Sequence, residues 1–287
     1  MSGPSRMPEA EAQPAACPLV DIGANLTNKA FRGDLEGVLA RAAGAGVTAI
    51  VMTGVNAQTS RLAREIAAEG RGAPAGSRPK LYATAGFHPH NASAFSEDSR
   101  VELADLLARP EVVAVGECGL DYNRDFSPRD VQRRCFEAQL ELAADVGKPV
   151  FLHERDAAED FAKVLERWRP RLRGGVVHCF TGTRDALERY LGLGMHIGIT
   201  GWICDERRGQ HLEELVRLVP EGRLLVETDA PYILPRSLPR DVRPKTGRNE
   251  PSLLPHVARV VARCRGETLD ALARHTTKAA SALFELG

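Results

Sequence analysis

The strongest constraint on the fold is an alternation of short apolar runs with longer segments of helical pattern along the 287-residue chain. Each run has the length and composition of a buried strand, and such alternation is typical of parallel strands joined by crossover helices. Eight such units in about 270 residues predict a closed (β/α)8 barrel, also called a TIM barrel. The expected strands are residues 18–22, 47–53, 81–87, 111–117, 149–153, 175–178, 196–201 and 223–228.

Helix signals between the runs support this architecture. Ser127 is expected to cap one helix, with Pro128 at its first position, and Gly147 followed by Pro149 is expected to end it. An open doubly wound sheet is the alternative fold, but no Gly-x-Gly-x-x-Gly motif follows the first run, so a dinucleotide site has no support. No internal repeat and no long linker divides the chain. We therefore expect residues 17–287 to form one barrel domain.

Composition limits where the protein acts and what it binds. The 38 basic and 38 acidic residues cancel, so any binding of nucleic acid must come from a local patch. No apolar run approaches the roughly 20 residues of a membrane helix. Residues 1–16 lack the apolar stretch of a signal peptide and predict a disordered tail. Six cysteines without a Cys-x-x-Cys pair indicate reduced thiols. We expect a cytoplasmic monomer, with nuclear access if the source is eukaryotic, and no membrane association. The cysteines are Cys17, Cys118, Cys135, Cys179, Cys204 and Cys264.

Ionisable residues follow the apolar runs at the same end of five expected strands. The run VVAVGECGLD (112–121) is an example, because a strand typical of a core reaches Glu117. The carboxyl ends of all barrel strands meet at one face, so these residues are expected to converge there. Imidazoles and carboxylates in one mouth would bind one or two divalent cations, such as zinc, manganese or magnesium. A cation would also offset the cost of burying the acid. The candidates are His88, His90, Glu117, His153, His178, Glu227 and Asp229.

Any one of these residues alone would say little about function. A histidine at a strand end is more often a hydrogen-bonded residue of the core or rim, and a single glutamate is more often solvated. The repetition at one level of the barrel is more informative, because packing alone would favour Val, Ile or Leu there. His196 is the exception, since it begins the seventh run and is expected at the opposite face. His211, His256 and His275 fall in helical patterns and are interpreted as structural.

The ordered set of motifs resembles the TatD deoxyribonuclease family, and the likeness runs from about Leu19 to Phe284. The resemblance implies a (β/α)8 barrel with magnesium-dependent exonuclease activity on 3′ ends and a preference for single-stranded DNA. RNA is a second candidate substrate, and DNA repair or degradation is the implied role. The motifs are FHPH (87–90), GECGLDYNRDFS (116–127), PVFLHERDA (149–157), VVHCFTGT (176–183), IGITGWICDERRG (197–209), VETDAPYILP (226–235) and RNEP (248–251).

The resemblance also implies roles for individual residues. Matched motif to motif, Glu117, His153 and His178 correspond to metal ligands, and Asp229 to the acidic residue of the catalytic centre and a further ligand. His88 falls on the His-Pro motif, where it is expected to contact a phosphate. The cation would lower the pKa of a bound water, and Asp229 would orient or deprotonate that water.

Three positions depart from the pattern of many relatives. Gly23 and Asn25 stand where a His-x-His pair is common, which removes two ligands, although the TatD branch carries this Gly-x-Asn form. The change predicts weakly held, exchangeable metal, which suits magnesium better than a zinc pair. Restoring both histidines is expected to raise zinc affinity. Glu154 stands where Cys is common, and we expect its side chain to point away from the barrel axis.

Two loops near the end of the chain offer contacts for a phosphate substrate. Barrels often bind phosphate after strands seven and eight, and residues 205–209 and 235–248 are rich in arginine there. Aromatic residues in the same loops could stack on unpaired bases. The alternative is that the arginines cover a solvated face and the aromatics pack the rim. The candidate substrate-binding residues are His90, Trp202, Arg207, Arg208, Tyr232, Arg243 and Arg248.

Two other classes of function remain open. The same ligands on the same barrel support hydrolysis of an amide or ester in a small molecule. A binding module with a decayed metal site is the other alternative, suggested by the missing His-x-His pair. A Ser-His-Asp hydrolase is disfavoured, because no Gly-x-Ser-x-Gly motif occurs.

Overall fold

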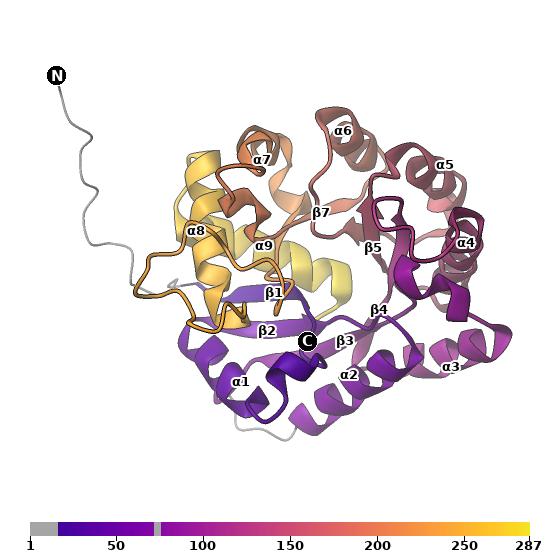
Figure 1. The fold of residues 1–287 in the computed structure, drawn as a ribbon, viewed down its shortest axis with the longest axis horizontal. Helices are drawn as coiled ribbons and strands as arrows, with labels where there is room; N and C mark the ends of the chain where they lie inside the picture. The colour runs from indigo at the N-terminus through magenta and orange to yellow at the C-terminus, as the bar shows by residue number, and fades with distance from the viewer. Residues whose placement is uncertain (1–16, 72–75) are drawn as a thin grey trace.

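Eight parallel strands form one sheet in the order β1 to β8, which curves into a barrel surrounded by helices (Figure 1). The structure is a computed structural model that describes residues 17–71 and 76–287, so the expected tail at 1–16 lies outside the described residues. Strand β1 meets the segment that follows β8 through a parallel bridge between Ala24 and Ala230. The predicted barrel and all eight predicted strands are therefore confirmed.

The strand boundaries differ from the expected ones by a few residues, and the difference matters for β4. This strand was expected to end at Glu117 but continues to Asp121, because its pairing with β5 resumes after a register shift between Val115 and Cys118. Glu117 and Asp121 therefore belong to one strand. The strands are β1 Leu19–Ala24, β2 Val47–Met52, β3 Lys80–Ala85, β4 Val112–Asp121, β5 Val150–Arg155, β6 Gly175–Val177, β7 His196–Ile199 and β8 Leu224–Val226.

Helices connect the strands and pack their apolar sides against the outside of the barrel. Helix α4 shows one error of the sequence analysis: it begins at Arg129, one residue later than expected, and Ser127 does not cap it. The Ser127 hydroxyl instead donates to the backbone carbonyl of His90 at 3.2 Å. Gly147 ends the helix in a left-handed conformation, as predicted. The helices are α1 Leu35–Gly44, α2 Ala57–Gly70, α3 Glu97–Leu107, α4 Arg129–Val146, α5 Ala158–Trp168, α6 Arg184–Gly192, α7 Gln210–Leu215, α8 Leu254–Arg265 and α9 Leu269–Phe284.

The interior of the barrel is closed at the amino ends of the strands. There the end of α9, with Leu283 and Phe284, belongs to the same buried cluster as residues inside the strands, among them Val113 and Val176. His196 lies at this end with Nδ1 3.2 Å from the carbonyl oxygen of Gly175, as expected for a structural histidine. The carboxyl ends of the strands remain available for a site.

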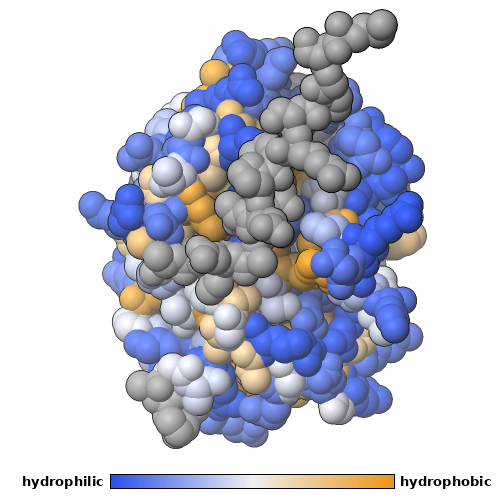
Figure 2. All heavy atoms as spheres, turned by 90° about the vertical axis from the view of Figure 1, so that its left-hand side faces the viewer, coloured by the Kyte–Doolittle hydropathy of each residue, from blue (hydrophilic) through white to orange (hydrophobic). Residues whose placement is uncertain are grey.

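The surface is largely polar where α1 and α8 lie. Figure 2 shows that this side is mostly hydrophilic, with small, separate hydrophobic areas. Within the described part of the chain, no helix is long and apolar enough to cross a membrane. All six cysteines are free thiols.

Candidate active site at the carboxyl end of the barrel

Glu117 is the centre of a histidine cluster. Its side chain is buried, and Oε1 lies 2.8 Å from Nδ1 of His153 on β5 and 2.8 Å from Nε2 of His178, which follows β6. Nε2 of His88, which follows β3, lies 3.3 Å from the same oxygen. Ligand atoms of His88, Glu117 and His153 all lie within 4.8 Å of one another. The fold thus brings together four residues that the strand ends had singled out.

Charged and neutral side chains lie together in this buried cluster. Burial alone would raise the pKa of Glu117, but the imidazoles of His178, His88 and His153 hold that pKa well below its usual value. Burial alone would lower the pKa of His178, but Glu117 and Glu227 raise it well above the usual range. By contrast, burial lowers the pKa of His88 to about 4, so this imidazole is neutral near pH 7.

Asp229 stands beside this cluster, three residues after the end of β8. It adopts a left-handed backbone conformation with φ 54, which is uncommon for residues other than glycine. Its Oδ1 accepts a hydrogen bond of 2.9 Å from Nδ2 of Asn25, the residue found in place of an expected histidine. Burial raises the pKa of Asp229 to about 7, the His178 imidazole opposes this effect, and the carboxylates of Glu117 and Glu227 add to it.

Glu227 contacts His178 through Nδ1, the ring nitrogen that does not face Glu117. Its Oε2 is 3.4 Å from Nδ1 of His178, and its Oε1 accepts a hydrogen bond from the backbone N–H of Cys179. A Cβ atom at Gly23 would meet Oε2 at 2.3 Å, and one at Gly198 would meet Oε1 at 2.5 Å. Two glycines on strands β1 and β7 therefore leave the space that this buried carboxylate fills.

Asp121 is a site residue that sequence reasoning missed. Its Oδ2 lies 2.7 Å from Nε2 of His90 and 3.5 Å from Nε2 of His153. Burial would raise the pKa of Asp121, but His153 and His90 lower it far below its usual value. A signal was available, because alternate residues of a strand share a face and Asp121 is an even number of residues from Glu117.

A cavity of about 640 Å³ opens over these residues. Eight of the residues proposed from the sequence line it, spread over positions 88 to 232. The eight are His88, His90, Glu117, His153, His178, Trp202, Asp229 and Tyr232.

The four arginines proposed from the sequence do not line this cavity. Arg207 and Arg208 both pair with the buried carboxylate of Asp205. Arg248 pairs with Asp34 and Glu250, and the Arg243 guanidinium donates to the carbonyl oxygen of Arg236. The cations that line the cavity are instead Arg124 and Arg155, which the sequence did not single out. They lie in or just after β4 and β5, where no strand-end pattern marks them.

Glu154 behaves as its position beside a strand-end histidine predicted. Its Oε1 accepts a hydrogen bond of 2.8 Å from the backbone N–H of Ala157, just before α5, and its Oε2 accepts one of 3.1 Å from the Tyr190 hydroxyl. Glu154 does not line the cavity over Glu117. The Glu154 side chain therefore forms hydrogen bonds with the surrounding helices, and it is His153 that lines the cavity.

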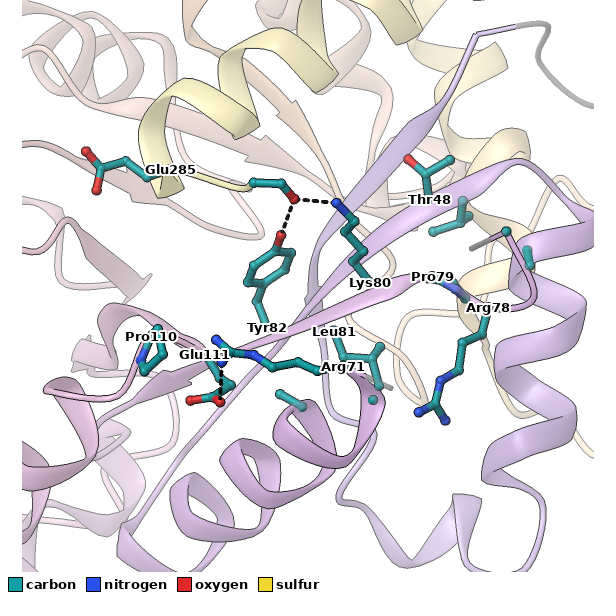
Figure 3. A pocket seen from close by; sticks show the side chains of 16 residues that line it. Thr48, Arg71, Arg78, Pro79, Lys80, Leu81, Tyr82, Pro110, Glu111 and Glu285 are labelled. Atoms are coloured by element: carbon teal, nitrogen blue, oxygen red, sulfur yellow. Dashed lines mark hydrogen bonds and ion pairs between the residues drawn. The ribbon is translucent and has the colours of Figure 1, made fainter. Parts of the chain in front are cut away.

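A second cavity, of about 670 Å³, lies at the other end of the barrel. It is drawn in Figure 3, with the Arg71–Glu111 ion pair on one side and Lys80 and Tyr82 donating to the backbone carbonyl of Gly287 on the other. No group of histidines and carboxylates spaced for a metal lies there within the described residues. The residues around this second cavity therefore belong to the face of the barrel that contributes to stability and not to catalysis.

The donor set of the Glu117 cluster fits a divalent cation. Imidazole nitrogens with carboxylate oxygens bind zinc and manganese, and carboxylates with water bind magnesium. Within the described residues, the buried Nε2 of His153 makes no close hydrogen bond, because its contact with Oδ2 of Asp121 is 3.5 Å long, and the atom is therefore available to a ligand.

Comparison with known proteins identifies the family. The family described as "TatD related DNase" matches residues 20–285. A protein of Pantoea vagans named 3′-5′ ssDNA/RNA exonuclease TatD is 50% identical over 268 residues, which cover 93% of this chain and 100% of that protein. Its counterpart from Escherichia fergusonii is 46% identical over 266 residues, 93% of this chain and 98% of that protein.

Solved structures agree with this assignment. The TatD homologue YJJV from Escherichia coli superposes with a TM-score of 0.83 at 31% identity, covering 94% of this chain and 99% of that one. A TatD family hydrolase from Entamoeba histolytica superposes with a TM-score of 0.84 at 27% identity, with the same coverage of both chains. On the extent of these matches, the chain belongs to the TatD family of metal-dependent deoxyribonucleases.

Proposed function

We propose that this protein is a divalent-metal-dependent 3′→5′ exonuclease that hydrolyses phosphodiester bonds of single-stranded DNA, and of RNA. The observation that carries the proposal is the convergence of three imidazoles on Glu117 beneath an open cavity. The chain is also half identical to exonucleases over nearly its whole length. A role in DNA repair or degradation follows from this activity.

The hydrogen bonds of His178 support its role as a metal ligand. A carboxylate can only accept, so Nδ1 of His178 must carry the proton that faces Glu227 at 3.4 Å. By the same argument Nε2 carries a proton toward Glu117 at 2.8 Å, in keeping with the raised pKa of His178. A bound cation would displace that proton and take the lone pair of Nε2, while Nδ1 keeps its proton toward Glu227. This is the arrangement by which a buried carboxylate orients a ligating histidine. We assign His178, His153, Glu117 and Asp229 to the cation.

His88 has the opposite arrangement, which supports a different role. Its Nδ1 accepts a hydrogen bond of 3.1 Å from the backbone N–H of His90, so the proton of the neutral ring is on Nε2. A protonated nitrogen cannot ligate a metal, although Nε2 lies within reach of the cluster. We therefore assign His88 the donation of a hydrogen bond from Nε2 to a phosphate oxygen of the substrate.

Asp229 is the residue best placed to handle a proton. A bound cation, magnesium in our proposal with manganese or zinc as alternatives, would neutralise charge on the phosphate and lower the pKa of a water. Asn25 holds Oδ1 of Asp229, which leaves Oδ2 to orient the attacking water or accept its proton. The exonuclease reaction then needs no nucleophile from the protein.

Arg124 and Arg155 are proposed to contact the backbone of the substrate. Both line the cavity, and within the described residues neither guanidinium is paired with a carboxylate. Arg155 donates to the Thr181 hydroxyl at 3.0 Å and lies 5.7 Å from the centre of the Trp202 ring. An uncompensated cation beside the site attracts a phosphate chain, whereas the paired Arg248 contributes less.

Two further properties are part of the proposal. Six free thiols are typical of a protein kept in a reducing compartment, so we propose a cytoplasmic location. The site is complete within one chain, so we propose that a monomer is active. Cell fractionation and light scattering of the purified protein test these two points.

The decisive experiment is digestion of single-stranded and double-stranded oligonucleotides labelled at the 3′ or the 5′ end. We expect loss of the 3′ label first, with single strands degraded faster, in Mg2+ or Mn2+ but not in EDTA. Turnover of small amides or esters without cleavage of any oligonucleotide would instead favour the small-molecule hydrolase. Oligonucleotide binding without any metal-dependent cleavage would favour a binding module.

A further inference from the structure

Two large hydrophobic side chains are exposed at the mouth of the cavity. The Phe126 side chain is 68% exposed and that of Tyr232 is 53% exposed, and both line the cavity over Glu117. The other large hydrophobic residues exposed in the described part of the chain do not line it. Leaving such surface in water costs free energy, so its position at the mouth points to a partner that covers it.

The two rings belong to opposite sides of the barrel. Phe126 lies in the segment after β4, and Tyr232 lies after β8. With eight strands in the order β1 to β8, these two strands are half a turn apart. The ring of Phe126 lies 4.7 Å from that of His90, and the hydroxyl of Tyr232 accepts a hydrogen bond of 2.9 Å from Asn28. The Glu117 cluster therefore lies between them.

The backbone that carries Phe126 is held firmly on its C-terminal side. Ser127 is 1% exposed, and its hydroxyl accepts a hydrogen bond of 3.2 Å from the backbone N–H of Ser93 as well as donating to His90. The Ser127 carbonyl accepts another, of 2.8 Å, from the side chain of Gln132. The exposed ring thus follows from the position of a fixed segment.

The N-terminal side of Phe126 is held as well. Arg129 donates from Nε to Oδ1 of Asp125 at 3.0 Å and from Nη2 to Oδ2 at 2.7 Å, and its guanidinium lies 4.3 Å from the centre of the Tyr122 ring. A ring on a backbone fixed at both ends loses little conformational entropy on binding. That is the requirement for a stacking platform.

Tyr232 is fixed in a similar way. Its backbone N–H donates to the carbonyl of Asp229 at 3.0 Å, and its own carbonyl accepts a hydrogen bond of 2.7 Å from the side chain of the fully buried Asn249. Both rings are therefore presented to the cavity by ordered segments.

Trp202, the other aromatic residue expected to stack on bases, is engaged differently. The guanidinium of Arg208 lies 4.5 Å from the centre of its ring, and that of Arg155 lies 5.7 Å away. Both distances are in the range of a cation–π contact. Trp202 therefore serves to position Arg155, and Phe126 and Tyr232 are the aromatic surfaces left for a base.

We propose that Phe126 and Tyr232 form a base clamp, which stacks one unpaired base on each side of the phosphodiester bond that is cut. This inference rests on the proposed function, because it takes the Glu117 cluster as the point of cleavage. Stacking uses the face that every base has, so the clamp accepts any sequence and both DNA and RNA. A base pair at a duplex end must open before its bases can enter the clamp, which disfavours double strands.

The test compares single-stranded oligonucleotides that are identical except for one abasic residue, at the last or the second-last position of the 3′ end. The rate kcat/KM for the first cleavage is measured for the parent protein, Phe126→Ala and Tyr232→Ala. We expect the parent to lose about tenfold at each abasic position. In Phe126→Ala, kcat/KM on the intact strand should be about tenfold lower than in the parent. Removing the base at one of the two positions should then cause no further decrease in kcat/KM. Tyr232→Ala should be insensitive at the other.

Further variants separate stacking from other effects. Phe126→Trp should restore the parent pattern and Phe126→Leu should not, because leucine keeps the hydrophobicity but not the ring. Tyr232→Phe removes the hydrogen bond to Asn28 but keeps the ring, so it should keep the abasic penalty at both positions. Val242→Ala, at an exposed valine outside the cavity, is the matched control and should change nothing. Thermal unfolding checks that each variant is folded.

The clamp and the exonuclease can fail separately. If the parent degrades the intact strand but both alanine variants keep the full abasic penalty at both positions, the clamp is wrong and the exonuclease stands. If no oligonucleotide is cut with any metal, the proposed function is wrong, and the anisotropy of the same labelled strands in EDTA then decides on the clamp. Equal affinity of the parent and Phe126→Ala for the intact strand in that assay would overturn it.

Discussion

The carboxylate of Glu227 fills the space that a side chain at position 23 would need. A Cβ atom built on Gly23 would lie 2.3 Å from Oε2 of Glu227, far inside van der Waals contact. Glu227 is fully buried, and its two oxygens face the backbone N–H of Cys179 and Nδ1 of His178. The absence of a histidine at position 23 is therefore coupled to the presence of a carboxylate that orients His178.

Gly23→Ala is expected to lower both stability and activity, because Glu227 must move and release His178. Overpacking of this kind costs about 1–3 kcal/mol. The clash also changes the expectation from the sequence that histidines at positions 23 and 25 raise zinc affinity: Gly23→His should fail to add a ligand. Denaturant unfolding and metal titration measure both effects. Gly192→Ala, where nothing lies within 4 Å of the added atom, is the control. A Gly23→Ala protein with the parent's stability would show that the space is not occupied as described.

Local patterns were sufficient to predict the barrel and most of the cluster. Strand runs and the residues at their ends are read from consecutive positions, and the barrel places those ends together whatever the details of packing. The role of Glu227 in orienting His178 could not be predicted from the sequence. It depends on glycines of β1 and β7 that lie against the Glu227 side chain, which follows β8. Its neighbours in the sequence do not reveal that contact.

The basic residues show the same limit. Arginine-rich loops drew attention to Arg207, Arg208, Arg243 and Arg248, but charge in a sequence does not show pairing. In the structure, Asp205 forms ion pairs with Arg207 and Arg208, and Glu250 forms one with Arg248. Only the folded structure shows which cations, such as Arg155, face the cavity without a carboxylate partner.

The two kinds of histidine predict different defects. His178→Ala should lose most of its affinity for Mn2+ or Zn2+, because Nε2 of His178 supplies a lone pair to the site. His88→Ala should keep nearly the parent's metal affinity and instead lower kcat/KM, because Nε2 of His88 donates to the substrate. Calorimetric titration of metal into each purified variant measures the first quantity. His211→Ala, on the exposed surface of α7, serves as the control. Loss of metal binding in both variants to the same degree would make His88 a ligand.

Salt dependence distinguishes the cavity arginines from the paired ones. Arg155→Ala is expected to weaken single-strand binding and to reduce the slope of log affinity against log salt by nearly one, the contribution of one phosphate contact. Arg248→Ala should change the slope less and the stability more, because Arg248 pairs with Asp34 and Glu250. Arg134→Ala, an exposed i,i+4 partner of Asp130 on α4, is the matched control. Equal slopes for the parent and Arg155→Ala would remove this residue from the substrate path.

Asp21 is a second buried carboxyl group, on β1 and away from the cavity lining. Its Oδ2 lies 2.6 Å from the Thr228 hydroxyl, and its Oδ1 accepts hydrogen bonds from the backbone N–H groups of Thr228 at 3.0 Å and Gly23 at 3.3 Å. Burial nevertheless raises the pKa of Asp21 to about 7, since these hydrogen bonds offset only part of the desolvation. The folded protein therefore holds a proton there that the unfolded chain releases above about pH 4.

The sign of the resulting pH dependence follows from that difference. The stability that protonated Asp21 contributes is fully present below about pH 4 and is lost as the pH rises through about 7, because the unfolded chain ionises first. Asp21→Asn keeps an acceptor for the two backbone donors and a donor for Thr228, but it cannot titrate. Between pH 5 and pH 8 the parent should therefore lose about 2 to 3 kcal/mol more unfolding free energy than the variant, at about 1.4 kcal/mol for each pH unit. Urea unfolding at both pH values measures this, with the exposed Asp241→Asn as control. If Asp21→Asn and the parent lose stability in parallel, Asp21 is ionised in the folded protein.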